Sequence, residues 1–376
     1  TVNGIPATGN KKLMRGILRD EMGFDGVLIS DWAAIEETIY HGYCADKEDA
    51  AIRAVEAGVD IDMMTGIYCD NLCRLVREGK IPESLVDECC MRILELKNKL
   101  GLFENPYKDA DEEKEQQLIL CKEHRELARE AARKSFVLLK NEEQILPLDK
   151  TKKTAFIGPY VNSRNLMGSW SIIGEAKDIT TVEEIMAVEE AGNNVVCCQG
   201  SPMLGAEVIL EGFTEENQAT YTPEEEAKML EEALEAAKKA DQVVLFIGED
   251  RLQSGEATSN ATIQIPQIQQ NLLERVAEIN ENIAVVLFSG RPLDLRDVQV
   301  KAKAILEVWM PGTEGAGAIT DVLYGRYNPT GKLPMSFPYC VGQVPVHYNE
   351  YATGRPHVEG KDKDRFRSKY LDIPNA

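Results

Sequence analysis

The sequence is poor in basic residues and in long apolar runs, and both shortages exclude classes of partner. Lys and Arg total 42 against 63 Asp and Glu, which makes the formal net charge −21 at pH 7. That charge repels nucleic acid and anionic membrane surfaces, so a neutral or cationic small molecule is the easier partner. No apolar run approaches the roughly 20 residues that span a bilayer, and the N-terminus has no basic-then-apolar signal pattern. We therefore expect no nucleic-acid partner and no membrane partner.

Cysteine and histidine occur in patterns that favour neither disulfides nor metal sites. The nine cysteines are an odd number, and two pairs are adjacent in sequence, Cys89 with Cys90 and Cys197 with Cys198. There is no Cys-x-x-Cys and no His-Glu-x-x-His, and the four histidines are scattered. Buried free thiols in a reducing compartment are the simplest interpretation, which predicts a cytoplasmic protein. Because the chain opens in the middle of a motif, a periplasmic or secreted parent protein remains open.

A length of 376 residues favours two globular units, and the first hundred residues alternate between helical and strand-like patterns. Apolar spacing predicts a helix over Lys11–Glu21, which Gly23 ends. Short apolar runs at 27–29 and 59–63 predict buried parallel strands, with a helix over Asp46–Ala57 between them. Two more helices are expected at Asp70–Arg77 and Ser84–Leu100.

The composition turns acidic and polar over residues 106–117, which indicates a linker before a long amphipathic helix that ends near Lys134. Beyond it, helical stretches separate most of a series of apolar runs. Thr222, Pro223 and Glu225 form a capping-box pattern at the start of a helix that runs to Ala240. This alternation predicts a second, open α/β sheet. Its expected strands are 155–157, 194–198, 242–247, 283–288 and 304–308.

Asp31 follows the apolar run 27–29, at the carboxyl end of a predicted strand, where parallel α/β proteins place their working residues. A carboxylate at this place also serves as an ordinary helix cap. The next residue, Trp32, favours a sugar site, because aromatic faces stack on the C–H surface of a sugar ring. The alternative for Trp32 is an ordinary core tryptophan.

Several segments together resemble glycoside hydrolase family 3, in the branch typified by periplasmic β-glucosidases. Residues 23–32, GFDGVLISDW, are similar to the nucleophile segment of that family, in which the Asp before Trp attacks the anomeric carbon. The resemblance extends over nearly the whole chain. Its other segments, in the family's order, are 3–7 (NGIPA), 18–21 (LRDE), 57–63 (AGVDIDM), 133–141 (RKSFVLLKN), 309–312 (WMPG) and 328–334 (NPTGKLP).

The resemblance implies an α/β fold: the C-terminal remnant of a (β/α)8 barrel, followed by an open α/β sandwich domain. The implied organisation is a partial barrel over 1–107 with the nucleophile, a linker and connecting helix over 108–134, a sandwich domain over 135–340 with the acid/base, and an irregular tail over 341–376. Most of the N-terminal barrel and the family's fibronectin-like domain are missing from this arrangement. A partial barrel leaves a sheet edge unpaired, so we expect the isolated chain to be inactive or nearly so.

Retaining hydrolysis needs a second carboxyl group roughly 5–5.5 Å from the nucleophile, and the best candidate is Glu256. It lies in the small-residue segment 254–259, SGEATS, which is similar to the loop that carries the family's acid/base. Glu249 is the runner-up and is expected to have a supporting role. For either residue the alternative is a solvated surface charge. The family usually carries an Arg shortly after the acid/base, where Asn260 stands here.

Three further residues are expected at the sugar site through the resemblance. They are Trp32, Met63 and Trp170, the last in a segment, 167–171 (MGSWS), that resembles a loop reaching the sugar. A plain packing role is the alternative for Trp170. We expect no cofactor and no metal.

The resulting prediction is a retaining, exo-acting β-glucosidase that acts on a β-glucoside or oligosaccharide by double displacement. A β-xylosidase or a dual glucosidase/xylosidase is the near alternative, and an N-acetylglucosaminidase is disfavoured. From other classes, we retain a non-catalytic carbohydrate-binding remnant and a nucleotide-binding unit. The latter rests only on the glycine cluster 312–317, whose spacing is not the dinucleotide fingerprint. The oligomeric state stays open.

Overall fold

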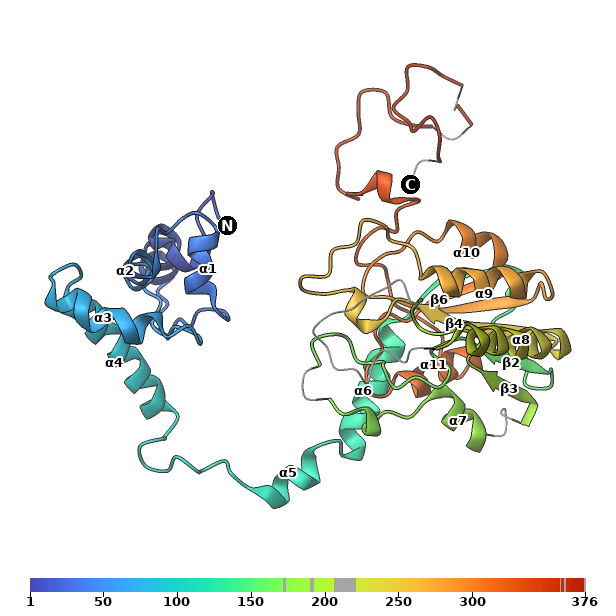
Figure 1. The fold of residues 1–376 in the computed structure, drawn as a ribbon, viewed down its shortest axis with the longest axis horizontal. Coiled ribbons are helices and arrows are strands. Elements are labelled where there is room, and N and C mark those ends of the chain that lie inside the picture. Colours follow the sequence, from blue (N-terminus) through green and yellow to red (C-terminus); the bar gives the residue numbers. More distant parts are fainter. Residues whose placement is uncertain (172–173, 190–192, 206–220, 359, 362, 375–376) are drawn as a thin grey trace. The chain divides into compact units, whose positions relative to one another are not determined.

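A computed structural model of the chain describes residues 1–171, 174–189, 193–205, 221–358, 360–361 and 363–374. It divides into two units, Thr1–Glu115 and Gln116–Ala376 (Figure 1). Each unit has hydrophobic clusters of its own. Within the described ranges no helix combines the length and the apolar character that crossing a membrane requires.

The N-terminal unit consists mainly of helices around one small core. After a 3-10 turn at Ala7–Gly9 and a π-helix at Lys12–Glu21 come α1 (Ala34–Tyr40), α2 (Lys47–Ala57), α3 (Ile67–Arg77) and α4 (Glu83–Lys99). Helix α5 (Glu112–Leu118) follows at the boundary between the units. Ile35, Val55 and Leu75, from α1, α2 and α3, are fully buried in the core.

Local sequence signals account for the ends of α2. Asp46 caps its first turn, because the Asp46 carboxylate accepts a hydrogen bond from Asp49 N at 2.9 Å. Gly58 ends the helix in the left-handed region, with φ of +92°. The predicted helix over Asp46–Ala57 is thus confirmed, with Asp46 as the cap.

Two predicted features of this unit differ from the structure. The helix predicted over Lys11–Glu21 is present as a π-helix over Lys12–Glu21, whose backbone bonds run from residue i to residue i+5. Its apolar side chains are four residues apart, and this spacing does not distinguish a π-helix from an α-helix. The predicted strands at 27–29 and 59–63 reduce to a single parallel bridge between Ile29 and Ile61. The bonds around this bridge are Asp60 N to Leu28 O at 2.8 Å and Ser30 N to Ile61 O at 2.9 Å.

The C-terminal unit contains a six-stranded sheet in the order β1-β6-β5-β4-β2-β3. Only β1 runs antiparallel to its neighbour, β6, and the other pairs are parallel. The strands are β1 (Val137–Asn141), β2 (Thr154–Ile157), β3 (Val195–Cys198), β4 (Gln242–Gly248), β5 (Ile283–Phe288) and β6 (Ala304–Glu307). Every strand predicted for this sheet is present, and β1 was not predicted.

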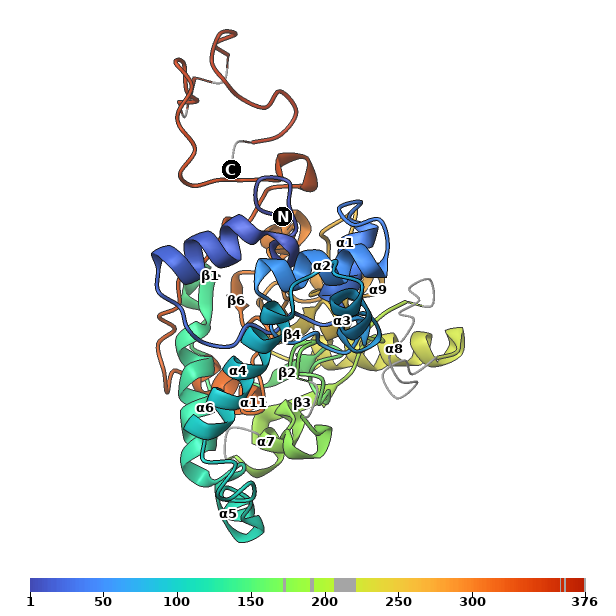
Figure 2. The same ribbon diagram turned by 90° about the vertical axis from the view of Figure 1, so that its left-hand side faces the viewer.

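Helices cover both faces of this sheet (Figures 1 and 2). One face packs against α6 (Lys122–Ser135), α7 (Val182–Val188) and α11 (Gly315–Leu323), and the other against α8 (Pro223–Lys239), α9 (Gln267–Ala277) and α10 (Arg296–Lys301). Alternate residues of β4 enter the two cores: Val244 and Phe246 on the first face, Val243 and Leu245 on the second. Burial on both sides explains why the central strands are continuous apolar runs.

The remaining described elements are short 3-10 turns at Glu142–Gln144, Ala176–Asp178, Arg251–Gln253 and Val341–Gln343. The described part of 344–374 contains no helix or strand.

Candidate active site

In the N-terminal unit, residues 28–31 form an extended stretch, here called the inner segment, which pairs with residues 60–61 and ends at Asp31. The Asp31 side chain is exposed, and its carboxylate accepts a hydrogen bond from Trp32 N at 2.7 Å. Ala33, at φ of +55°, turns the chain in the left-handed region before α1 begins. One carboxylate oxygen of Asp31, Oδ1, therefore binds the backbone of the next residue, while the side chain as a whole remains exposed.

Trp32 and Met63, the other residues of this unit that were predicted for the sugar site, lie beside Asp31. Met63 N donates to Ser30 Oγ at 2.9 Å, and Met63 O accepts from Ala33 N at 3.2 Å, so Met63 brackets the segment that holds Asp31. Trp32 is 64% exposed, which excludes the alternative of a core tryptophan within this structure. The N-terminal unit thus brings Asp31, Trp32 and Met63 together on two neighbouring segments.

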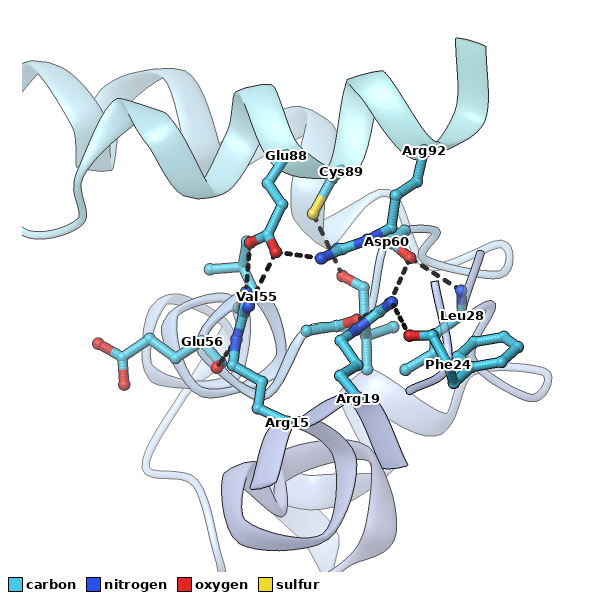
Figure 3. A network of polar contacts seen from close by, with 12 residues as sticks. Arg15, Arg19, Phe24, Leu28, Val55, Glu56, Asp60, Glu88, Cys89 and Arg92 are labelled. Atoms are coloured by element: carbon cyan, nitrogen blue, oxygen red, sulfur yellow. Dashed lines mark hydrogen bonds and ion pairs between the residues drawn. The ribbon is translucent and has the colours of Figure 1, made fainter. Parts of the chain in front are cut away.

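A buried charge network holds the inner segment in place, and sequence analysis assigned it no role (Figure 3). The Asp60 side chain is fully buried and forms ion pairs with Arg19 at 2.9 Å and Arg92 at 2.8 Å. The same carboxylate accepts from Leu28 N at 2.8 Å, three residues before Asp31. Arg19 also donates to the backbone oxygens of Gly26 and Gly58, both at 3.0 Å. The π-helix, α4 and the inner segment are therefore joined through one carboxylate.

One feature of the sequence, the position of Asp60, indicates such a network. Asp60 is an acid inside the apolar run 59–63, and a carboxylate buried in a strand-like segment requires cationic partners. Which arginines supply the charge is a tertiary question, because Arg19 and Arg92 lie 41 and 32 residues away in sequence.

In the C-terminal unit, the predicted residues gather where parallel α/β sheets bind their ligands. The neighbouring strands β2 and β4 are followed by α7 and α9, which pack on opposite faces of the sheet. The connections after β2 and β4 therefore diverge at the carboxyl edge, which is the topological switch point, the place where open α/β sheets generally bind ligands. Trp170 lies in the connection after β2 and Glu256 in the connection after β4.

The loop that carries Glu256 starts with a capped turn. The Asp250 carboxylate accepts from Leu252 N at 2.8 Å and from Asn165 Nδ2 at 2.6 Å, and Asp250 N donates to Gln253 Oε1 at 2.9 Å. Asn165 lies in the connection after β2, so this acid ties the two connections together. Burial raises the pKa of Asp250 above its ordinary value, and these hydrogen bonds oppose the rise. Glu256 itself is exposed at the tip of the loop.

The segment with Trp170 packs directly against this loop. Gly255 has φ of +120°, and a Cβ atom there would lie 2.5 Å from Ser169 Oγ, so only glycine fits. Trp170 is 67% exposed and follows Ser169, just as Glu256 follows Gly255. The structure therefore places the segments of Glu256 and Trp170 against each other and leaves the Trp170 side chain largely exposed among the described residues.

Glu249, the runner-up for the acid/base, is buried. Its side chain is 2% exposed and pairs with Arg291 at 3.1 Å. Burial raises the pKa of Glu249, and Arg291 opposes the rise. Because a sugar in solution cannot reach a carboxyl group so placed, the expectation that Glu249 supports the site fits its position better than a catalytic role. Among the described residues, no group of three or more His, Cys, Asp or Glu side chains converges as metal ligands do.

Comparison with known proteins defines the class. Residues 136–370 match the model described as glycosyl hydrolase family 3 C-terminal domain, and residues 1–96 match glycosyl hydrolase family 3 N terminal domain. The chain therefore belongs to glycoside hydrolase family 3, as the sequence motifs predicted.

Individual relatives show how similar the chain is to characterised members of the family. The chain is 40% identical to a periplasmic beta-glucosidase of Salmonella typhimurium, over all of this chain and 50% of that protein. It is 33% identical to a beta-xylosidase of Formosa agariphila, over 97% of this chain and 49% of that protein. The chain thus spans about half the length of these curated relatives.

The solved structures confirm the predicted fold class, a barrel remnant followed by an open α/β domain. A β-glucosidase from Listeria innocua, in complex with isofagomine, superposes with a TM-score of 0.87 at 41% identity. The match covers 99% of this chain and 49% of that one.

Proposed function

We propose that this chain carries both catalytic carboxylates of a retaining exo-β-glucosidase, Asp31 as the nucleophile and Glu256 as the acid/base. One observation carries the proposal: each unit presents an exposed carboxylate beside an exposed tryptophan, Asp31 with Trp32 and Glu256 with Trp170. Tryptophan faces stack on the C–H surface of a sugar ring, and a retaining glycosidase needs two carboxyl groups, one that attacks the anomeric carbon and one that protonates the leaving oxygen.

The reaction proceeds in two displacements. An Asp31 oxygen attacks the anomeric carbon as the bond to the glycosidic oxygen breaks, and the Glu256 carboxylic acid gives its proton to that oxygen. The products are a free alcohol and a glucosyl ester of Asp31. Glu256, now a carboxylate, removes a proton from a water molecule whose oxygen attacks the same carbon. The ester bond breaks, glucose leaves with its configuration retained, and both acids return to their starting states.

The relatives favour a terminal β-glucosyl residue as the substrate. The Listeria innocua β-glucosidase has been solved with glucose, and a mutant of that enzyme with laminaribiose, which is consistent with oligosaccharide binding. The Formosa agariphila relative supports a second candidate, β-xylosidase activity. Measuring kcat/KM for 4-nitrophenyl β-glucoside and for 4-nitrophenyl β-xyloside distinguishes the two candidate activities. A higher value for the xyloside would show that the protein is a β-xylosidase and not a β-glucosidase.

Hydrolysis of 4-nitrophenyl β-glucoside tests the two carboxylates. The assay compares the 376-residue chain with a chimera in which it replaces the matching half of the Listeria innocua β-glucosidase. We expect Asp31→Asn to reduce turnover to background and Glu256→Gln to lower it by about 10²–10⁴-fold, the usual contribution of a general acid/base. We also expect azide to restore part of the Glu256→Gln activity, because an anionic nucleophile needs no general base.

Matched controls and a trapping experiment complete the test. Asp25 and Glu281 are exposed acids, and Asp25→Asn and Glu281→Gln should leave turnover unchanged.

A 2-fluoro-glucoside with a dinitrophenyl leaving group should esterify Asp31, and peptide mass mapping identifies the labelled residue. Full activity of Asp31→Asn, or a label on another residue, overturns the assignment. Sugar binding without any label supports the carbohydrate-binding remnant instead. If the chimera hydrolyses the substrate and the isolated 376-residue chain does not, this result supports the expectation that the isolated chain is inactive.

The cysteines support a reducing compartment, which is the basis for proposing a cytoplasmic location. All nine are free thiols. Burial raises the pKa of Cys197 and of Cys198 to about 12, so these adjacent thiols are poor nucleophiles and oxidise slowly. Fractionation of source cells tests the location, and recovery in the periplasmic fraction, as the name of the Salmonella relative suggests, would refute it.

A further inference from the structure

Arg291, which follows β5, contacts both ends of the loop that holds Glu256. Its Nη2 atom donates to the backbone oxygen of Gln253, three residues before Glu256, and to that of Thr258, two residues after it, at 3.0 Å for Thr258. One guanidinium nitrogen therefore joins the two ends of a six-residue arch, 253–258, with Glu256 inside it.

The Glu256 side chain has no such support of its own. Among the described residues its carboxylate forms no hydrogen bond and no ion pair, so its direction depends on the backbone of the arch. Inside the arch, Thr258 Oγ1 donates to Gly255 O at 2.7 Å, and Ala257 adopts the left-handed region at φ of +57°. Asn260 Nδ2 reaches Gln253 O at 3.3 Å, a longer contact to an oxygen that Arg291 already binds.

Arg291 is itself held from the side of the sheet. Its Nε atom lies 3.1 Å from Glu249 Oε1, and the Glu249 side chain is 2% exposed at the end of β4. A Cβ atom on the preceding residue, Gly290, would lie 1.9 Å from Ser254 Oγ, so the backbone before Arg291 touches the start of the arch. Glu249, Arg291 and the arch thus form a chain of contacts from a buried strand end to the exposed acid.

We propose that Arg291 is the positioning residue of Glu256: it holds the arch so that the Glu256 carboxyl points at the departing oxygen. This inference rests on the proposed function, because it takes Glu256 as the acid/base. A planar guanidinium presents nitrogens at separate positions in a fixed fork, whereas a lysine ammonium has a single nitrogen and cannot occupy both the Nε and the Nη2 positions. Lysine at 291 can keep the charge beside Glu249 but loses the link between the ends of the arch.

The test uses Arg291→Lys and the dependence of kcat/KM on the leaving group, in whichever form of the protein, chain or chimera, is active. A 2,4-dinitrophenolate leaves without a proton, whereas the alcohol of methyl β-glucoside requires one. We expect Arg291→Lys to lower kcat/KM for methyl β-glucoside by about 100-fold, as a misplacement of about 1 Å does, and to change it less than about threefold for the dinitrophenyl glucoside. The control Arg296→Lys alters another arginine that is paired with a carboxylate, and it should leave kcat/KM unchanged for both substrates.

The outcomes separate the two proposals. If Glu256→Gln itself shows no leaving-group dependence, Glu256 is not the acid and the proposed function fails. If Glu256→Gln shows it and Arg291→Lys loses activity equally on both substrates, or loses none, the role of Arg291 is refuted. A loss confined to methyl β-glucoside supports it, because a general weakening of the fold affects both substrates alike.

A second variant and a second readout keep the proposal testable if Arg291→Lys folds poorly. Glu249→Gln keeps the shape of the side chain that holds Arg291, and we expect the same leaving-group pattern with a smaller loss. Hydrogen exchange of the 376-residue chain should show faster exchange at the amides of 253–260 in either folded variant, with β4 and β5 unchanged. Unchanged exchange in the arch together with an unchanged leaving-group ratio overturns the inference.

Discussion

At the scale of single residues, the buried acid Glu307 has a strongly perturbed environment. Its side chain is fully buried, accepts from Trp309 N at 2.8 Å and from Ser289 Oγ at 3.2 Å, and leaves Oε2 without a hydrogen-bond partner in the described structure. Burial raises the pKa of Glu307 to about 8, and the nearby Glu249 adds to the rise. At neutral pH the folded protein therefore keeps Glu307 largely protonated.

The raised pKa of Glu307 predicts that the free energy of unfolding decreases as pH rises. In the unfolded chain the glutamate pKa is about 4.3, so the stabilising effect of the bound proton is fully present below that pH and is lost as pH rises through about 8. In this window one such group contributes about 1.4 kcal/mol per pH unit.

We therefore expect Glu307→Gln to flatten the pH dependence of unfolding between about pH 5 and about pH 8 by roughly that slope, since its amide cannot ionise. Urea unfolding at several pH values measures the effect, and the exposed control Glu281→Gln should behave like the original chain. Equal slopes for Glu307→Gln and the original chain would show that Glu307 does not titrate in this range.

At the scale of elements, one carboxylate fixes the segment that ends in Asp31. Removing the charge of Asp60 leaves Arg19 and Arg92, whose side chains are only 7% and 13% exposed, without their shared anion. Breaking a buried pair in this way costs about 3–5 kcal/mol. We expect Asp60→Asn to destabilise the N-terminal unit by an amount of this order.

Denaturant unfolding followed by circular dichroism measures the loss for Asp60→Asn. The matched control is Asp25→Asn, which changes an exposed acid near the same segment and should stay within about 0.5 kcal/mol. A similar small change for Asp60→Asn would mean that the network in Figure 3 contributes little to stability.

At the scale of the whole molecule, the two units have separate hydrophobic clusters and are connected by a chain that is exposed throughout residues 103–120. In the C-terminal unit, α6 is held to α11 by Asp321, which Arg129 contacts through two bonds of 2.8 Å. Burial acts to raise the pKa of Asp321, but Arg129 and Arg326 lower it below its ordinary value.

Separate cores predict separate unfolding transitions. In calorimetry of the 376-residue chain we expect two transitions, with Asp60→Asn lowering the temperature of one and Asp321→Asn that of the other. Proteolysis within 103–120 should release both units as folded fragments. A single transition shifted by both variants would show that the units unfold together.

The elements of the C-terminal unit were predictable because their signals are local. β4 and β5 are continuous apolar runs, and Thr222 and Glu225 form a complete capping box in the structure. The antiparallel strand β1 was not predicted, because Val137–Asn141 follows α6 without a turn signal and is stabilised by pairing with β6, far along the chain. The bridge at Ile29 and Ile61 likewise depends on partners and not on its own composition.

By itself the sequence determined the family, the five parallel strands β2 to β6, and the choice of the two acids proposed for catalysis, since motifs and periodicity reside in consecutive residues. Only the tertiary structure decided how those acids are supported. It buried Glu249 and exposed Glu256, seven residues apart, and it placed Arg291 across the arch around Glu256. It also joined Asp60 to two distant arginines. The physical reason is that burial and charge pairing are set by groups far apart in the chain, which no local pattern encodes.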